Sequence, residues 1–395
     1  MRRRVWVASG SLLLIGALLL STTVSPSDTQ AVIEPHLGYG VNIAERTNMD
    51  LVRDMGFGWV KSFVSWASVE PQEGGGYNWA DVDNVIDYAQ QYSLKLLLRV
   101  ERPPDWAREA GTTKTGPVRP DKLDAFADFL DKLVEHAQGK VAAYEIWNEP
   151  NLKAEWGGRL PDPEYYVEIL KTAYFAIKGC DPEAMVVSAG LSTAGEGGEG
   201  AMGDLIYLRA MYDAGAKNYF DALGSHPYGG PYNPDETNAR GGMCFHRAKQ
   251  QHDVMVEYGD GDKKVWATEF GWVLKTDCDL GEDHEWMEVS EEEQAAYLVR
   301  AYHKAHEEWP WMGVMFLFNL DFGADYYQAG CPSGKAMCSP VRYYSITYRQ
   351  DPCDPAHNPI LQRKAYLALK AMPKPPLPLT PRAYLPAVFK NYVSP

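Results

Sequence analysis

Short apolar runs rich in β-branched and aromatic residues alternate along the chain with segments of helical periodicity. Apolar side chains recur at i, i+3, i+4 and i+7 over residues 82–89 and 123–134, which predicts two amphipathic helices. Residues 291–306 and 360–372 also fit a helical pattern. The eight β-rich runs are residues 38–43, 59–66, 95–100, 142–147, 185–190, 222–226, 265–270 and 314–319.

Strands that alternate with helices are typical of parallel sheets built from crossover units. Eight such units within residues 36–372 predict a single α/β domain, a (β/α)8 TIM barrel. The alternative, a doubly wound open sheet, needs a glycine-rich phosphate loop after the first strand, and residues 38–42 (GYGVN) lack the third glycine. The longest insertions follow strands six, seven and eight, and in a barrel these loops frame the active face.

The two ends of the chain lie outside this pattern. Residues 1–30 start with three arginines and continue into a short apolar stretch, which predicts a signal peptide or, alternatively, an uncleaved N-terminal anchor. Residues 373–395 are rich in proline and resemble the short C-terminal tails of some secreted bacterial proteins. We therefore expect a secreted or extracellular-surface protein, attached to the cell surface through the anchor or the tail. The alternative for the tail is that it packs on the domain.

Composition excludes some classes of protein and of ligand. With 395 residues, of which 45% are hydrophobic and 23% charged, the chain resembles globular rather than disordered proteins. Its 53 acidic residues outnumber 38 basic ones, for a net charge of −15, which argues against binding nucleic acid or other polyanions. The 12 tryptophans and 24 tyrosines imply either a thick core or a surface suited to flat ligands.

Two of the predicted strands open into a loop at a glutamate. Glu149 follows strand four and Glu269 stands near the end of strand seven, both among indole rings. Catalytic groups of a barrel stand at these strand ends, and two carboxylates there are the equipment for glycoside hydrolysis. A lone glutamate would more simply be a solvated rim charge, so it is the pair that favours catalysis.

Four segments resemble clan A glycoside hydrolases, in particular families 5 (cellulase-like) and 39. These segments are 147–151 (WNEPN), 268–272 (TEFGW), 65–83 (SWASVEP, then GYNW and an aspartate) and 225–228 (SHPY). The resemblance covers residues 36–372. It implies retaining hydrolysis of β-glycosidic bonds by double displacement, without metal or cofactor.

The resemblance also assigns roles to individual residues. It implies that Glu149 is the general acid/base and Glu269 the nucleophile. It implies that Asn148 holds the 2-hydroxyl of the reacting sugar. His226 and Tyr228 match the group on strand six that orients the nucleophile and closes the floor of the subsite.

One position departs from the clan pattern. Many members carry arginine on strand two near the nucleophile, and this chain has Lys61 there, with Arg99 on strand three as the residue that could supply the bidentate fork instead. A functional pair of Asn148 and Glu149 also requires the alternation of strand four to break at its end, as by a bulge. Glu145 then lies deeper, and we expect it to be paired inside the barrel.

Tryptophans at strand ends are candidates for stacking on sugar faces. We expect this role for Trp272, three residues beyond the nucleophile, and for Trp66 and Trp147; the alternative is packing in the core or a loop. Asn319 is a further candidate at the end of strand eight, where clan members often have tryptophan and this chain reads FLFN over residues 316–319.

Six cysteines in an exported chain allow up to three disulfides. We expect two bridges among the five in the late loops, and Cys180 as a buried free thiol; those five are Cys244, Cys278, Cys331, Cys338 and Cys353. The nine histidines form no motif typical of a metal site.

Together these features predict a monomeric retaining glycosidase that is endo-acting on a neutral polysaccharide or oligosaccharide. The excess of acidic residues is the reason for expecting a neutral rather than an acidic glycan. Two alternatives stay open from the sequence: a transglycosylase that remodels glycans with the same residues, and a non-catalytic carbohydrate-binding barrel.

Overall fold

The computed structural model describes residues 36–237, 239–322, 338–350 and 358–375. The predicted signal peptide or anchor, the tail from residue 376 onward, Cys331 and Cys353 lie outside these ranges. Within them, no helix combines the length and the apolar character that crossing a bilayer requires.

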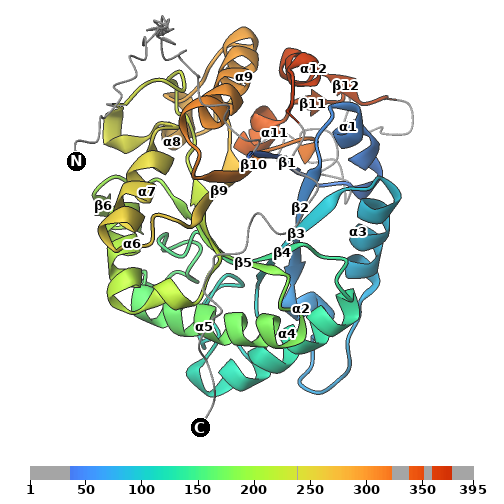
Figure 1. Ribbon diagram of the computed structural model, residues 1–395, viewed down its shortest axis with the longest axis vertical. Coiled ribbons are helices and arrows are strands. Elements are labelled where there is room, and N and C mark those ends of the chain that lie inside the picture. Colours follow the sequence, from blue (N-terminus) through green and yellow to red (C-terminus); the bar gives the residue numbers. More distant parts are fainter. Residues whose placement is uncertain (1–35, 238, 323–337, 351–357, 376–395) are drawn as a thin grey trace, which may run out of the picture. The chain divides into compact units, whose positions relative to one another are not determined.

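Eight parallel strands close into a barrel (Figure 1). The first strand pairs with the second and with the last, so the sheet has no open edge and the doubly wound alternative is excluded. All eight predicted runs are strands, and the predicted (β/α)8 fold is confirmed. The barrel strands are β1 (Gly38–Asn42), β2 (Trp59–Ser65), β3 (Lys95–Glu101), β4 (Ala143–Asn148), β5 (Met185–Ser192), β8 (Ala222–His226), β9 (Lys264–Phe270) and β10 (Met312–Leu317).

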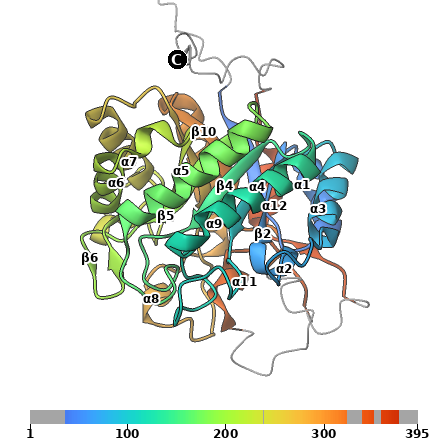
Figure 2. The ribbon, with the colours of Figure 1, turned by 90° about the horizontal axis from the view of Figure 1, so that it is seen from below.

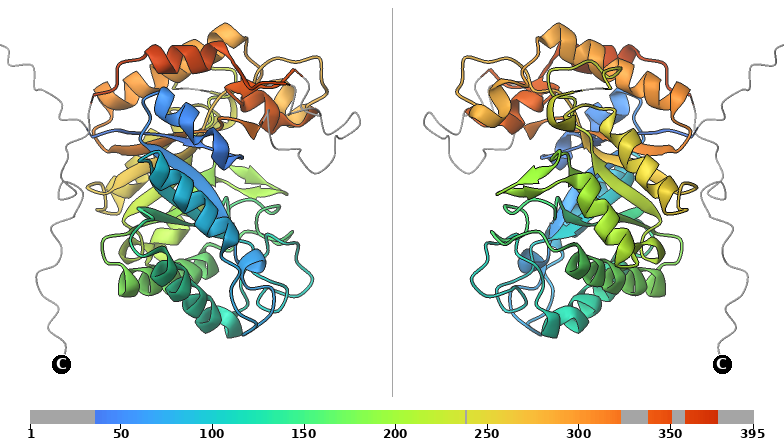
Figure 3. Two further views of the ribbon diagram at one scale, coloured as in Figure 1. Left: turned by 90° about the vertical axis from the view of Figure 1, so that its right-hand side faces the viewer. Right: turned by 90° about the vertical axis from the view of Figure 1, so that its left-hand side faces the viewer.

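Helices surround the barrel. Figure 3 shows it from two opposite sides, with α3 on one side and α6 and α7 on the other. The helices are α1 (Met49–Asp54), α2 (Trp66–Val69), α3 (Ala80–Gln91), α4 (Leu123–Ala137), α5 (Pro163–Cys180), α6 (Asp204–Asp213), α7 (Arg247–Glu257), α8 (Glu282–Glu285), α9 (Glu291–Glu308), α11 (Pro340–Tyr344) and α12 (Lys364–Ala371). Two small hairpins pair β6 (Gly197–Gly198) with β7 (Ala201–Met202) and β11 (Thr347–Tyr348) with β12 (Leu361–Gln362).

Local sequence signals explain where the long helices begin. At the start of α9, the Ser290 side chain accepts a hydrogen bond from the Glu293 backbone, and the Glu293 side chain accepts one from the Ser290 backbone. At the start of α5, Asp162 caps the Tyr165 amide and Pro163 occupies the first helical position, where its missing N–H costs nothing.

The interior of the barrel is filled in layers. The lowest contains apolar side chains from seven strands, with Trp59, Trp266 and Phe316 in mutual ring contact. The next residue on the same face of β2 is Lys61, two positions beyond Trp59. An apolar floor therefore lies beneath a polar layer, which is where a TIM barrel carries its chemistry.

A small second core covers part of the active face. Val273, Leu280, Met287 and Tyr344 are its buried members, and Tyr228 and Phe318 pack against it. The short elements α2, α8 and α11 gather at one end of the barrel (Figure 2), which is the end where the strands finish.

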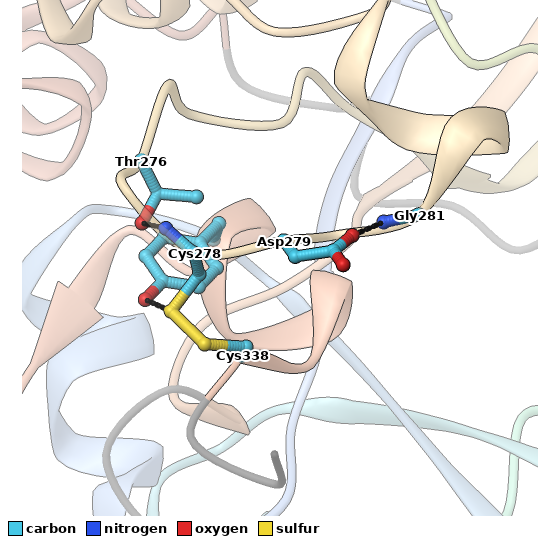
Figure 4. Close-up of a disulfide and its surroundings, with 6 residues drawn as sticks. Thr276, Cys278, Asp279, Gly281 and Cys338 are labelled. Carbon is cyan, nitrogen blue, oxygen red and sulfur yellow. Dashed lines mark hydrogen bonds between the residues drawn. A yellow bond between two sulfur atoms is a disulfide. The ribbon is translucent and has the colours of Figure 1, made fainter. Parts of the chain in front are cut away.

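A disulfide between Cys278 and Cys338 ties the loop after β9 to the segment before α11 (Figure 4). In the same loop Cys278 donates its amide to Thr276, and Gly281 donates to Asp279. Of the two bridges expected, this one is present, and the other stays a prediction because two of the five cysteines lie outside the described residues.

Two cysteines within the described residues are free. Cys244 is buried, whereas Cys180 is exposed. The prediction of a buried Cys180 is wrong because this residue ends α5 at the surface, where its thiol reaches Asp131.

The double variant Cys278→Ser/Cys338→Ser should lose about 2–4 kcal/mol of unfolding free energy, because the bridge closes a long loop of the unfolded chain. The two cysteines are 60 residues apart in sequence. Chemical denaturation under oxidising conditions measures the change. Cys180→Ser, which removes an exposed free thiol, is the matched control and should leave stability unaltered; a double variant as stable as the wild type would contradict a stapling role.

Candidate active site

Strand β4 delivers two consecutive side chains to the mouth of the barrel. Trp147 has φ of 78° and Glu149 has φ of 38°, so the regular alternation of the strand is broken at its end. Such left-handed conformations cost about 1–2 kcal/mol for residues other than glycine. The expected break is therefore present, produced by left-handed residues. The Glu149 amide still donates to the Gly190 carbonyl of β5, which anchors the turn.

Glu269, the last residue but one of β9, is 8% exposed and held at both oxygens. Oε1 lies 2.9 Å from Arg99 Nη1 and 3.4 Å from Lys61 Nζ. Oε2 accepts a hydrogen bond of 2.8 Å from the Tyr228 hydroxyl. The carboxylate is thus fixed in one orientation.

These partners also set the charge of Glu269. Burial alone would raise its pKa, but the charges of His226, Lys61 and Arg99 and the hydrogen bond from Tyr228 outweigh burial and lower the pKa to about 2. Glu269 is therefore ionised throughout the neutral and mildly acidic range, as a nucleophile has to be.

His226 joins the two glutamates. Its Nδ1 lies 2.8 Å from Glu149 Oε1 and 3.9 Å from Glu269 Oε2, and the ring is fully buried. The ring lies against β5, where a Cβ at Gly190 would come within 2.1 Å of Nε2. Only glycine leaves room for the imidazole, so this residue on β5 lets His226 approach both carboxylates.

Asn148 is held through its carbonyl. Its Oδ1 accepts a hydrogen bond of 2.7 Å from Arg99 Nη1. The amide group also hydrogen-bonds to Glu155, whose pKa is raised by burial and by the negative charge of Glu149. Glu155 was not predicted as a site residue, since nothing in its loop, residues 149–162, indicates that the chain folds back onto the site.

The expected ion pair inside the barrel is present. Lys61 Nζ lies 2.7 Å from Glu145 Oε2, and both side chains are almost completely buried. Lys61 also donates to the Thr268 carbonyl, and Glu145 Oε1 accepts from the Gly190 amide. A single ammonium thus bridges Glu145 and Glu269.

Arg99 reaches Glu269, but not with the fork that was expected. Only Nη1 contacts Glu269. The bidentate face of the guanidinium is turned to Glu101, with Nε 3.0 Å from Oε2 and Nη2 3.4 Å from Oε1. Glu269 therefore receives two single contacts, one from a lysine and one from an arginine.

The three tryptophans predicted to stack on sugars do not reach the site. Trp66, Trp147 and Trp272 are 1%, 2% and 1% exposed, respectively. Trp66 donates to Glu70, and the other two donate to backbone carbonyls of loops. The prediction is wrong because these rings fill space between strand ends, loops and outer helices instead of facing the barrel mouth.

Asn319 is also misassigned. It is fully buried, its amide donates to the Val341 carbonyl, and its carbonyl accepts from Ser345 and from the Phe322 amide. These contacts fasten α11 to the end of β10, so the side chain has no face left for a sugar.

A cavity of ≈560 Å³ opens beside Glu269. Among the residues that line it are Asn42, Lys61, Phe63, Arg99, Phe318 and Phe322. The aromatic rings that reach this space are therefore phenylalanines, none of which was predicted from the sequence as a site residue. Among the residues described, no three His, Cys, Asp or Glu side chains are grouped so that they could hold a metal ion.

Solved structures of low sequence identity share the fold. A family 39 glycoside hydrolase from Bacteroides cellulosilyticus WH2 superposes with a TM-score of 0.60 at 21% identity, covering 85% of this chain and 62% of that one, so the chain spans less than two thirds of its length. A family 39 β-xylosidase from Caulobacter crescentus gives a TM-score of 0.57 at 18% identity, covering 85% and 70%.

Sequence comparison identifies the family. A β-xylosidase from Caldicellulosiruptor saccharolyticus is 28% identical over 123 residues, which is 28% of this chain and only 24% of the relative. The family model described as cellulase (glycosyl hydrolase family 5) matches residues 24–305, most of the chain. With a barrel fold and this match, the chain belongs to the cellulase family, glycosyl hydrolase family 5.

Proposed function

We propose that the protein is a retaining β-glycosidase in which Glu269 is the nucleophile and Glu149 the general acid/base. The observation that carries this proposal is the position of His226 Nδ1, 2.8 Å from Glu149 and 3.9 Å from Glu269. Because both carboxylate oxygens lie so close to one atom, the distance between them is shorter than nearly all of the ~6.5–9.5 Å range by which inverting enzymes separate their two carboxyl groups. So short a separation suits direct attack of Glu269 on the anomeric carbon.

In the first step, a carboxylate oxygen of Glu269 attacks the anomeric carbon while Glu149 transfers its proton to the leaving oxygen. The C–O bond to the leaving group breaks and a glycosyl ester forms. Asn148, held by Arg99 through its carbonyl, presents its NH2 group to the sugar hydroxyl next to the reacting carbon. The hydrogen bond from Tyr228 keeps the attacking carboxylate from rotating.

In the second step, Glu149 removes a proton from a water molecule that attacks the same carbon, and Glu269 leaves as a carboxylate. Lys61 and Arg99 favour this step, since esterification deprives them of a negative partner and its release restores one. Two displacements at one carbon give retention of configuration.

The substrate that this arrangement supports is a β-linked glycan. Relatives of the same fold are described as β-xylosidases, which makes β-xylosides a reasonable first panel. The cavity beside Glu269 falls within the ~300–1,000 Å³ range of sites that enclose drug-sized ligands, more than one sugar ring requires. Space for several units supports endo-action on a chain.

Glu269→Ala and Glu149→Ala should each lower turnover of 4-nitrophenyl β-xyloside, or of the best aryl glycoside found, by about 10²–10⁴-fold or more. With a 2,4-dinitrophenyl leaving group, which needs no proton, only Glu149→Ala should retain a rapid first step. Burst kinetics measure that step, and proton NMR of the first product establishes its anomeric configuration.

Glu183→Gln is the control for these variants, because it removes an exposed carboxyl before β5, away from the site, and should leave turnover unchanged. Equal losses for both alanine variants on the dinitrophenyl substrate would contradict the division of roles. Inverted product would reject the mechanism, and transfer to an added sugar acceptor in preference to water would favour a transglycosylase.

A second prediction concerns pH. Lys61 is one of the charges that lower the pKa of Glu269 to about 2, so its removal should raise that pKa and move the acid limb of kcat/KM to higher pH. Because the pKa lies below the ordinary 4.5, ionised Glu269 stabilises the fold above about pH 4.5, and this contribution is lost as the pH falls toward 2.

Lys61→Met alone would leave Glu145 buried without its ion-pair partner, which should lower the free energy of unfolding by about 3–5 kcal/mol. The double variant Lys61→Met/Glu145→Gln removes both charges and should recover much of that stability while keeping the shifted acid limb. Lys61→Arg, which keeps a cation, is the matched control. An acid limb at the wild-type pH in the double variant would show that Lys61 does not act on the nucleophile.

A further inference from the structure

The cavity beside Glu269 lies on one side of the catalytic pair. Glu269 lines it, whereas Glu149 does not, and most of the lining comes from the ends of β1, β2 and β3 and the segments that follow them. In the proposed mechanism the leaving group departs on the side of Glu149. The cavity therefore accepts the part of the substrate that becomes bound to Glu269, the glycone.

Phe63 forms a wall of this cavity. It stands two residues beyond Lys61 on β2 and hence on the same face of the strand. Its side chain is 48% exposed, although large apolar side chains are usually covered. The guanidinium carbon of Arg102 lies 4.8 Å from the ring centre, a cation–π contact that fixes one side of the wall.

Arg102 brings donors to the same wall. Its Nε lies 3.0 Å from Glu101 Oε1, and within the described residues its two terminal nitrogens have no partner. The residue has φ of 57°, a conformation that glycine adopts without cost and arginine does not. A long cationic side chain is thus present at a position where the backbone favours glycine.

Lys114 adds a second cation to the lining. It is exposed, and none of the described residues forms an ion pair or hydrogen bond with its ammonium group. The other cations of the cavity have partners: Lys61 with Glu145, Arg99 with Glu101 and Glu269, and Arg46 with Asp81. Arg102 and Lys114 therefore carry the donors that a ligand can use.

We propose that Phe63, Arg102 and Lys114 form a subsite for a glycone-side sugar that bears an anionic group, a carboxylate or a sulfate ester. Phe63 offers its ring to the C–H face of the sugar. Arg102 and Lys114 offer charge-assisted hydrogen bonds to the anion. The inference rests on the proposed function for its orientation along the glycan, and it refines the expectation of a neutral substrate: a neutral backbone with an anionic side group.

Kinetics on matched substrates test this subsite. Three xylo-oligosaccharides are compared: one unsubstituted, one with a glucuronate on a glycone-side unit, and one with a sulfate ester there. The wild type should favour at least one anionic substrate about tenfold in kcat/KM, mainly through KM. The carboxylate and sulfate arms show which anion fits.

Variants separate the roles of the three residues. Two variants, Arg102→Gln and Lys114→Ala, should each reduce the preference for the anionic substrate toward unity. In Arg102→Gln, Glu101 keeps its pairing with Arg99. Phe63→Leu should weaken the binding of charged and uncharged substrates alike and leave the ratio of their kcat/KM values unchanged. The control is Lys140→Ala, because Lys140 is exposed before β4 and lies away from the cavity lining. This variant should alter neither the preference for the anionic substrate nor the binding of either substrate.

Absence of a preference in the wild type, or a preference that survives both cation variants, would overturn the subsite. Calorimetry of the same oligosaccharides with the wild type and the Arg102→Gln and Lys114→Ala variants keeps this result apart from the catalytic proposal. If no glycan is cleaved but the anionic one binds more tightly and the variants abolish the difference, the catalytic proposal fails and the subsite stands.

Discussion

The active end of the barrel depends on the contacts between the buried ammonium of Lys61 and two carboxylates. The ammonium lies between Glu145 and Glu269, with almost no exposure to water. Either carboxylate alone would be costly to bury in its ionised form, and a lysine without them would lose its proton or destabilise the fold. Together with His226 and Arg99, this one cation keeps Glu269 ionised although the carboxylate is only 8% exposed.

The inward face of β2 shows how this layer is built. Trp59 belongs to the apolar floor, Lys61 to the charged layer and Phe63 to the cavity wall, each two residues after the last. A lysine suits the middle position because its point charge can face several acceptors at once, whereas the planar fork of an arginine is best matched to one carboxylate. Arg99 behaves accordingly, since its fork is occupied by Glu101.

Sequence patterns predicted the barrel and the meeting of Glu149 with Glu269, because strand order alone brings the ends of parallel strands to one rim. They also predicted that Glu145 is paired inside. They failed for Trp66, Trp147 and Trp272, since the direction of a ring at a strand end depends on backbone torsions such as the left-handed φ of Trp147. Phe63 was missed for a related reason: a phenylalanine inside an apolar strand indicates burial, and only the neighbouring loops determine that it stays exposed.

The loop core that carries Tyr228 has a further consequence. The hydroxyl that orients Glu269 belongs to a residue packed among Val273, Tyr344 and Phe318, in loops joined by the Cys278–Cys338 bridge, and not to the interior of the barrel. Local opening of such a unit requires less free energy than global unfolding. Loosening of these loops would therefore end the alignment of Glu269 while the eight strands still form a closed scaffold.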